Sequence, residues 1–389
     1  MKLSWHSSFL AVAFLTACSG SHNAGLPPTE TMRSHEANVA STSTACVLVS
    51  STLGIPSAGS LTLAATSATD AWSFGEKNPP FVNALPVDHF DGVAWTASPF
   101  PAIPSPFASI NSAYAIAPND VWAVGAAGVP TSGPSVQLIF HWNGSAWSAV
   151  THPKWPFFVP DVVYADAPND VWIAGTRIFS RVFLAHWDGT SWTLRNWIYD
   201  VDDASGLAVF GPNSVTVSFI AVFLGESETN AFVLRWDGTT IHKELLPPLN
   251  GVFPLEVTGF GGTSPTDLWA VGNNSNRASY IAHRHFTWSP FIVSVDAQSM
   301  EPVSVAPFRS TYAVAETFSQ STSNGGLLVY NGVNRWRLTA NPFPAGTSPS
   351  ARIVVLKNTT SFWSVIVSPN GASNTPVLIQ CPANPPPPV

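Results

Sequence analysis

The chain carries little charge. Only 10% of its 389 residues are Asp, Glu, Lys or Arg, against roughly 25% in an ordinary soluble domain. There are 16 Lys and Arg, they form no run, and the formal net charge is −7. Nucleic acids and anionic membrane surfaces are bound through clustered basic side chains, so the sequence argues against both as electrostatic partners.

Long apolar runs and cysteines are scarce as well. Beyond the N-terminal segment, no stretch reaches the roughly 18 uninterrupted apolar residues that a membrane-spanning helix needs, and there are only three cysteines. Prolines number 35 and glycines 26, a frequency that interrupts helices and suits dense turns. Because 45% of the residues are hydrophobic, a large core can still form, and the composition predicts an all-β protein.

Residues 1–17 have the layout of an export signal. Lys2 precedes a short apolar segment over residues 9–15, and the sequence Leu-Thr-Ala-Cys ends at Cys18. The apolar segment is too short for a stable transmembrane helix. The residues around Cys18 resemble the lipobox of bacterial lipoproteins, which implies cleavage after Ala17 and lipidation of Cys18. The alternative is an ordinary signal peptide that happens to end near a cysteine.

The lipobox resemblance implies an exported monomer that is held on the bacterial cell envelope by its N-terminal lipid. Ser19 favours the outer membrane if the source has two membranes, because an Asp at that position is the usual retention signal. Residues 18–43 are small and polar and should form a flexible tether. We expect a folded domain over residues 44–381 and a proline-rich tail over residues 382–389.

Two short sequence motifs, called here the first and the second phrase, recur along the chain. Asp-Val-Trp-Ala-Val-Gly over residues 120–125 returns at 170–175, at 267–272 and, more loosely, at 70–75. His-Trp-Asn-Gly-Ser-Ala-Trp over residues 141–147 returns in variant form at 186–192, 89–95 and 235–238. Degenerate copies of the first phrase around residues 216, 312 and 363 complete seven units that lie about 48 residues apart.

Each unit contains short β-rich runs. In the third unit four runs cover residues 161–165, 171–175, 182–186 and 191–194. The Asp-Gly pair between the third and fourth runs is a strong hairpin signal, because a tight two-residue turn needs positive φ. Four antiparallel strands that repeat at this spacing are typical of a β-propeller blade, so the chain is predicted to form a seven-bladed β-propeller. A sandwich would not explain seven copies of one phrase.

The last unit lacks a fourth strand. It supplies only the runs at residues 352–356, 362–367 and 376–381, whereas an unassigned run at residues 46–50 precedes the first blade. We expect the N-terminal run to complete the last blade and close the ring, which would place Cys46 and Cys381 on adjacent strands. A disulfide is then expected in an oxidising exported compartment. The alternative is two free thiols.

The recurring tryptophans are interpreted as structural, because large side chains at one position of every blade can fill the gap between radiating sheets. The Asp of the first phrase is expected to accept backbone N–H groups in the turn before its strand. His89, His141 and His186 lie on different blades and should not form a metal cluster. His283 and His285 share a strand, but without a carboxylate or thiolate ligand beside them they are weak evidence for a metal site. The structural tryptophans are Trp72, Trp95, Trp122, Trp147, Trp172, Trp192, Trp269 and Trp336.

Together the two phrases resemble the repeats of exported bacterial propeller proteins, over residues 44–381. More distantly, the turn before the fourth strand is similar to the Asp-box of sialidases and photosystem assembly propellers, and the repeat is similar to the kelch units of galactose oxidase. These resemblances imply the propeller fold, and a fold does not by itself imply an activity.

The sequence lacks the residues that the candidate enzyme classes require. The Phe/Tyr-Arg-Ile-Pro phrase of sialidases is absent, no cysteine remains for a galactose-oxidase type of copper site, and no Gly-x-Ser-x-Gly or His-Glu-x-x-His motif occurs. Most carboxylates belong to the repeat phrases. No cofactor or metal is therefore expected. The alternative is a carbohydrate-active enzyme with acids in the central tunnel, for which the isolated carboxylates are Asp202, Asp203, Glu226 and Glu316.

The connections between blades are rich in proline and aromatic residues. We expect them to form an exposed aromatic rim on one face of the ring, able to stack on sugars or apolar peptide segments; the alternative is that these rings pack beneath the crossovers. The candidate ligand-binding residues are Trp155 first, then Phe107, Phe157, Phe158, Phe253 and Phe343. The predicted function is a non-enzymatic binding or scaffold module whose ligand is a glycan or an envelope protein.

Overall fold

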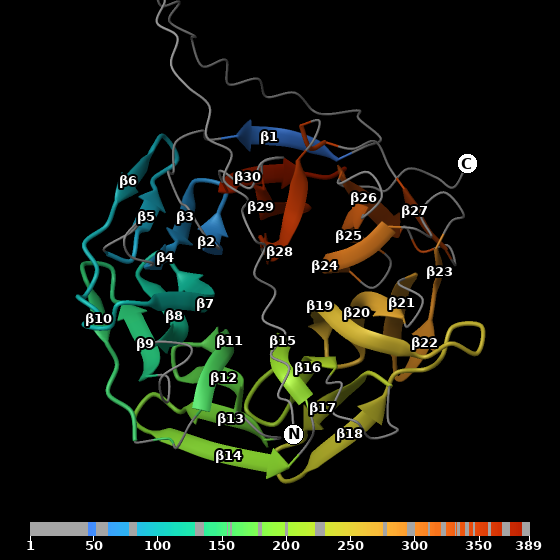
Figure 1. Ribbon diagram of the computed structural model, residues 1–389, viewed down its shortest axis with the longest axis horizontal. Coiled ribbons are helices and arrows are strands. Elements are labelled where there is room, and N and C mark those ends of the chain that lie inside the picture. The colour runs from blue at the N-terminus through green and yellow to red at the C-terminus, as the bar shows by residue number, and fades with distance from the viewer. Residues whose placement is uncertain are drawn as a thin grey trace, which may run out of the picture. The chain divides into compact units, whose positions relative to one another are not determined.

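The computed structural model in Figure 1 describes most of a compact unit that covers Thr42–Val389. The described residues are 46–51, 61–77, 84–128, 136–153, 155, 158–177, 181–198, 201–221, 230–274, 278–293, 300–309, 312–319, 324–330, 332, 335–338, 342–344, 347–356, 359–367 and 374–382. Cys18 with the expected signal and tether, Phe157, Glu226 and the tail from residue 383 lie outside them. Within these ranges no helix is long and apolar enough to cross a membrane.

Seven antiparallel sheets are arranged as a ring, which confirms the predicted seven-bladed propeller (Figure 1). Blade 1 consists of β2 (Thr62–Ser67), β3 (Asp70–Phe74), β5 (Val87–Phe90) and β6 (Trp95–Ala97). Blade 2 consists of β7 (Ala108–Ala117), β8 (Asp120–Ala127), β9 (Val136–Trp142) and β10 (Trp147–Ala149), and the short β4 (Glu76–Lys77) pairs with the inner strand β7. Blade 3 consists of β11 (Phe158–Ala167), β12 (Asp170–Arg177), β13 (Arg181–Trp187) and β14 (Trp192–Ile198).

The other four blades repeat this plan. Blade 4 consists of β15 (Val201–Val209), β16 (Val215–Ala221), β17 (Phe232–Trp236) and β18 (Ile241–Leu245), and blade 5 of β19 (Pro254–Ser264), β20 (Asp267–Asn274), β21 (Ser279–His285) and β22 (Thr287–Pro290). Blade 6 consists of β24 (Met300–Arg309), β25 (Tyr312–Ser319), β26 (Asn324–Tyr330) and β27 (Arg335–Leu338), with β23 (Ile292–Val293) parallel to β27. Blade 7 consists of β28 (Ser348–Val355), β29 (Ser361–Val367), β30 (Asn374–Gln380) and β1 (Val47–Ser51).

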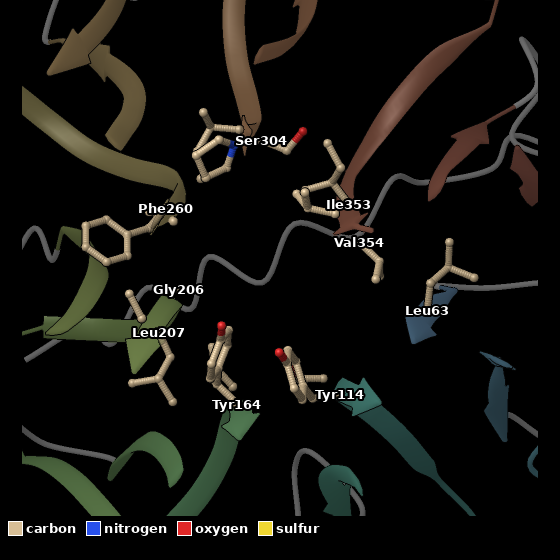
Figure 2. Close-up of a pocket in the computed structure, with 18 of the residues that line it drawn as sticks. Leu63, Tyr114, Tyr164, Gly206, Leu207, Phe260, Ser304, Ile353 and Val354 are labelled. Carbon is tan, nitrogen blue, oxygen red and sulfur yellow. The ribbon is translucent and has the colours of Figure 1, made fainter. Parts of the chain in front are cut away.

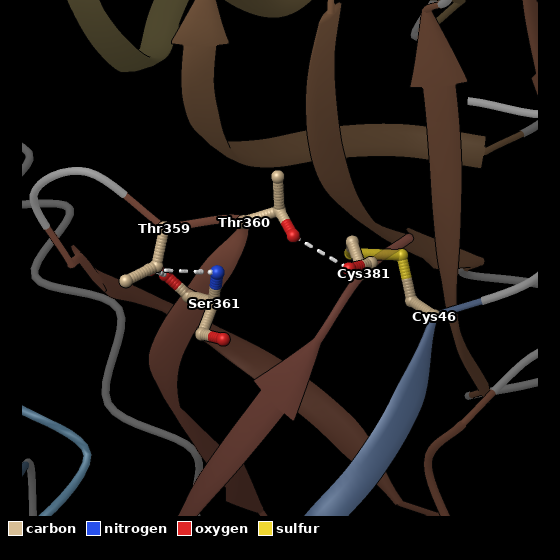
Figure 3. Close-up of a disulfide and its surroundings, with 5 residues drawn as sticks. All are labelled: Cys46, Thr359, Thr360, Ser361 and Cys381. Atoms are coloured by element: carbon tan, nitrogen blue, oxygen red, sulfur yellow. Dashed lines mark hydrogen bonds between the residues drawn. A yellow bond between two sulfur atoms is a disulfide. The ribbon is translucent and has the colours of Figure 1, made fainter. Parts of the chain in front are cut away.

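The first and last blades meet. The inner strands contact one another in succession around the ring, and β28 of blade 7 contacts β2 of blade 1. The N-terminal strand β1 pairs antiparallel with β30, with Val47 opposite Gln380. Cys46 and Cys381, the residues just outside that pair, form a disulfide (Figure 3). Beside it, the Thr360 hydroxyl donates a hydrogen bond to the Cys381 carbonyl oxygen at 2.6 Å.

The Asp-Gly turns have the predicted geometry. In blade 3 the Asp188 amide bonds the Ser191 carbonyl oxygen at 3.2 Å around two central residues, and Gly189 has a φ of +91°. Positive φ at the first central residue is the mark of a type II′ hairpin turn, which favours glycine there. The Asp188 carboxylate also accepts the amides of Thr190 and Ser191, each at 2.8 Å. Its hydrogen bonds, that from the Thr190 hydroxyl first, lower its pKa.

The repeated tryptophans join neighbouring blades, as predicted. The Trp on the second strand of one blade meets the Trp on the fourth strand of the next blade edge to face, an arrangement that aromatic rings favour. The centroid distances are 5.2 Å for Trp72 and Trp147, 6.0 Å for Trp122 and Trp192, 5.2 Å for Trp269 and Trp336, and 6.0 Å for Trp363 and Trp95. The last pair joins blade 7 to blade 1 and so contributes to ring closure.

The Asp of the first phrase bonds side chains rather than the backbone turn that we expected. In blade 3 Asp170 accepts hydrogen bonds from His186 Nε2 at 2.8 Å and from Trp172 Nε1 at 2.7 Å, and the imidazole stacks on the indole at 4.2 Å. An Asp–His bond under a Trp recurs in blades 1, 2 and 5. His283 therefore does have a carboxylate partner, contrary to the sequence prediction, and each of these histidines serves its own blade.

The glycine that ends the first phrase is required by a close approach of the backbone. The inner strand β11 shifts register between Pro160 and Val162. A Cβ on Gly175, opposite that bulge, would lie 2.0 Å from the Val159 carbonyl oxygen. Gly125 and Gly272 face the same obstacle in blades 2 and 5. The first phrase therefore encodes the Asp that binds a histidine, an interblade filler and the glycine that the bulge requires.

Blade 6 corrects one alignment that the sequence suggested. The pairing of β25 with β26 places Val314, and not Tyr312, at the position that Trp122 holds in blade 2. Tyr312 takes the position of the Asp. Because this copy contains neither Asp nor Trp, the sequence alone offered no fixed point for its alignment.

Candidate central cavity

A cavity of about 990 Å³ lies at the centre of the ring (Figure 2). Residues of all seven inner strands line it, together with the turn at residues 359–361 and Gln380 of blade 7. Apart from the start of β7, which pairs with β4, the inner edge of these strands has no neighbouring strand among the described residues, so backbone polar groups face the cavity there. The ring thus builds a chamber to which every blade contributes.

One layer of the cavity wall is strongly asymmetric. The strand pairing defines an equivalent residue in each blade, namely the inner-strand residue opposite the Trp position of the second strand. In blade order these residues are Ala64, Tyr114, Tyr164, Ala208, Gly261, Ala306 and Val354. Tyr114, Tyr164, Ala208, Gly261 and Val354 line the cavity, whereas Ala64 and Ala306 are buried outside its lining. Two adjacent blades therefore present tyrosines to the cavity in this layer, whereas blades 4, 5 and 7 present small side chains.

The two tyrosines form a pair. The ring centroids of Tyr114 and Tyr164 lie 4.3 Å apart with an angle of 36° between the rings, and Figure 2 shows both hydroxyls pointing into the cavity. Burial raises the pKa of both hydroxyls, and the charge of Asp166 raises them further. Both phenols therefore stay protonated at physiological pH and can donate a hydrogen bond as well as accept one.

A second layer, two residues earlier on the inner strands, is small and partly hydroxylated. Its described members are Thr62, Ser112, Val162, Gly206, Gly259 and Ser304; the seventh position is Arg352 of blade 7, whose side chain lies outside the described part of the structure. The Thr62 hydroxyl donates to the Ile110 carbonyl oxygen of the next blade at 2.8 Å, and the Ser112 hydroxyl oxygen accepts the Val163 amide at 3.1 Å. Such bonds fix the hydroxyls in the wall, and each oxygen keeps a lone pair for a further partner.

Among the lining residues that the structure describes there is no Asp, Glu, Lys, Arg or His. Of the carboxylates considered for an enzyme, Glu316 is buried behind the wall, where the Ser304 hydroxyl donates to it at 2.7 Å. Asp203 lies near Asp161 and does not line the cavity. The side chain of Asp202 lies outside the described part of the structure.

Asp161 is a buried carboxylate that sequence reasoning did not single out. It occupies the bulge of β11 and accepts hydrogen bonds from the Ala204 amide at 3.1 Å and the Thr176 hydroxyl at 3.2 Å. Burial, and then the charge of Asp203, raise its pKa well above the usual range. Its partners lie in blades 3 and 4, so it links these two blades. In the described ranges, no three His, Cys, Asp or Glu side chains gather as metal ligands.

The predicted aromatic rim is not exposed as we expected. Trp155 is only 5% exposed and contacts His152, Phe158 and Trp192. Phe158 and Phe343 are buried, Phe107 is half-buried, and Phe253 is 39% exposed. Burial of an aromatic ring removes a large apolar area from water, and the gap between blades offers that burial. The prediction of exposure is therefore wrong for Trp155, Phe158 and Phe343.

Sequence reasoning missed Tyr114 and Tyr164. The signal that could have found them is a difference between repeats: both tyrosines stand eight residues before the Trp of the first phrase, in blades 2 and 3 only. A residue shared by all repeats serves the fold, so a large side chain found in two of seven marks where the ring departs from symmetry.

No protein-family model and no curated protein matches this chain. Among solved structures it is similar to YCF48 bound to a D1 peptide, with a TM-score of 0.58 and 12% identity over 88% of this chain and 96% of that one. It is also similar to YCF48 from Cyanidioschyzon merolae, with a TM-score of 0.56 and 12% identity over 87% and 99%. A lectin of Aleuria aurantia aligns with a TM-score of 0.44 and 11% identity over 74% and 98%. At these identities the likeness is one of fold, and this chain shares the fold of the two YCF48 structures.

Proposed function

We propose that this chain is an exported, non-enzymatic binding protein of the bacterial cell envelope and that its ligand occupies the central cavity. The observation that carries the proposal is a cavity of about 990 Å³ lined by tyrosine, hydroxyl and apolar groups. Pockets of this size and mixed character hold small ligands, and a few polar groups orient them. A carbohydrate suits this chemistry best. A protein segment is the alternative, since YCF48 has been solved with a bound peptide.

The absence of charge from the described cavity lining supports binding rather than turnover. General acid and base catalysis needs a titratable group within hydrogen-bond reach of the reacting atoms, and glycoside hydrolysis ordinarily uses two carboxylates on either side of the bond. The buried carboxylates Asp161 and Glu316 do not line the cavity; Asp161 links blades 3 and 4, and Glu316 accepts a hydrogen bond from Ser304 within blade 6. The enzyme alternative therefore has less support than the binding module.

A binding experiment tests the proposal. Purified protein is titrated by calorimetry with glycans, peptidoglycan fragments and extended peptides, and each ligand is recovered and analysed for cleavage. We expect reversible binding of an unaltered ligand. Val354→Phe should abolish it by filling the cavity, whereas the matched control Phe253→Ala, which removes an exposed loop aromatic, should bind normally. Cleaved ligand, or binding that Val354→Phe leaves intact, would contradict the proposal.

The envelope location rests on Cys18 and its lipobox-like context. We expect Cys18→Ser to move the protein from the membrane fraction into the soluble exported fraction, because the lipid is the proposed anchor. The measurement is membrane fractionation with metabolic labelling by a fatty-acid analogue. Ser19→Ala, which keeps the acceptor thiol, serves as the control and should still be labelled. A Cys18→Ser protein that stays in the membrane fraction would rule out the lipid anchor.

We also propose that β1 and the disulfide hold the ring of blades closed. Their described pairing joins the N-terminal strand to the last blade, and a disulfide suits an exported protein, since oxidising compartments preserve it. A locked ring keeps seven inner strands in fixed relation, which a cavity built from all of them requires.

A further inference from the structure

We propose that the cavity selects an uncharged saccharide and that Tyr114 and Tyr164 are the residues that recognise it. This inference rests on the proposed function and narrows it to one ligand class. Its starting point is the break in ring symmetry: two adjacent blades place tyrosines where the other five place alanine, glycine or valine. Packing of the blades alone does not call for this difference, because the alanines of blades 4 and 6 occupy the same position in well-packed blades.

The tyrosine pair offers polar groups and ring edges to a sugar. The ring centroids lie 4.3 Å apart and the ring planes meet at 36°, so the two rings stack on one another and turn their hydroxyl-bearing edges into the cavity. The C–H groups of a pyranose can contact these ring edges. The phenols are protonated at physiological pH, and each hydroxyl can both donate and accept a hydrogen bond. The pair thus supplies apolar and polar contacts at one place on the wall.

The opposite wall leaves room for the ligand and offers acceptors. Figure 2 shows Val354 and Ser304 across the cavity from the tyrosines. On blades 4 and 5 the inner strands approach so closely that a Cβ on Gly206 would lie 2.6 Å from Phe260 Cβ. Glycine there uncovers backbone polar groups, which can bond ligand hydroxyls.

The absence of charge from the described lining decides which saccharides fit. A uronate, sialate or phosphorylated sugar would leave water for a site without a described cation, and an unpaired buried charge is strongly unfavourable. A neutral sugar loses only hydroxyl hydration, which tyrosine, serine and backbone groups replace. A peptide is less well matched, because its main chain needs a straight sheet edge, whereas this wall is a ring.

The test compares matched neutral and acidic probes. Cellotriose, chitotriose and maltotriose, with trigalacturonate as the acidic probe and an uncharged pentapeptide, are titrated by calorimetry into the wild-type protein, Tyr164→Phe, Tyr164→Ala and the double variant Tyr114→Ala/Tyr164→Ala. Thermal unfolding of each variant checks that it is folded. The wild type should bind at least one neutral trisaccharide and no trigalacturonate. Tyr164→Phe should weaken binding roughly 3- to 10-fold, as expected for one lost neutral hydrogen bond, and the double variant roughly 30-fold or more.

The outcomes separate this inference from the proposed function. Saccharide binding that the folded double variant retains, or trigalacturonate bound as tightly as its neutral counterparts, overturns the inference and leaves a binding cavity in place. Binding of the peptide but of no saccharide does the same. If the wild-type protein binds none of these probes and none of the ligands in the broader titration, the proposed function falls with the inference.

Discussion

Removal of the Cys46–Cys381 disulfide is expected to lower the free energy of unfolding by about 5 kcal/mol. The bond joins residues 335 positions apart, so it constrains nearly the whole domain in the unfolded state, and the entropic stabilisation grows with the logarithm of loop length. The change to make is the double variant Cys46→Ser/Cys381→Ser, measured by urea unfolding against the wild type. Reduction of the wild type should reproduce the loss.

The same variant should open the ring at one place. In it, β1 is held to β30 by backbone pairing alone, so amide protons of β1 and β30 should exchange faster than those of the central blades. Thr360→Val is a useful control, because it removes a hydroxyl beside the disulfide and leaves the bond. A double variant within about 1 kcal/mol of the wild type would contradict the account of ring closure, since so long a cross-link cannot be removed without consequence.

A second large effect is expected from Glu316. Its side chain is fully buried, and the Ser304 hydroxyl donates to one carboxylate oxygen at 2.7 Å. Burial raises its pKa from the usual 4.5 to about 7, although the hydroxyls of Ser364 and Ser304 oppose the shift. The folded protein therefore holds this proton over a pH range in which the unfolded chain has lost it.

The direction of the pH effect follows from this difference. The bound Glu316 proton adds to the free energy of unfolding. This stabilisation is fully present below pH 4.5, falls as the pH rises and is lost above about pH 7. A shift of this size corresponds to about 3 kcal/mol. We expect the wild type to lose that stability between pH 4.5 and 7.5, and Glu316→Gln, which mimics the protonated form, to lose much less. Urea unfolding at several pH values measures both.

Comparison with Glu316→Gln isolates one residue, because Asp161 has a raised pKa as well and contributes pH dependence of the same sign. Asp161→Asn is the matched variant at the interface of blades 3 and 4. If the wild type and Glu316→Gln show parallel pH profiles, Glu316 is not the group that titrates, and the account of its buried carboxyl must change.

The architecture could be predicted from the sequence because a motif that recurs about every 48 residues indicates one repeated structural unit. The recurring Asp-Gly, Trp and Gly mark a turn, an interblade contact and a bulge in the blades that keep them, and each has one physical task that the structure shows. Blade 6 has neither the Asp nor the Trp of the first phrase, and there the sequence alignment placed Tyr312 at the Trp position, two residues before the correct residue, Val314. The repeat therefore predicts strand register only in blades that keep the phrase.

The candidate site was harder to predict, because it depends on departures from the repeat. Trp155 looked exposed in sequence since it follows a Pro-rich crossover, but the gap between blades 2 and 3 buries it. Tyr114 and Tyr164 stand within ordinary strand sequence, and only the strand register shows that five other blades carry small residues at the same position. Whether a crossover aromatic turns outward or inward is decided by tertiary packing, which composition does not encode.

The most direct test of the central claim is a crystal structure of the protein with its tightest neutral saccharide. The account predicts electron density for the sugar inside the ring, in contact with the ring edges and hydroxyls of Tyr114 and Tyr164 and with its own hydroxyls toward Ser304 and the glycines of blades 4 and 5. A sugar bound on the loops that carry Phe253, with the central cavity filled only by water, would contradict it.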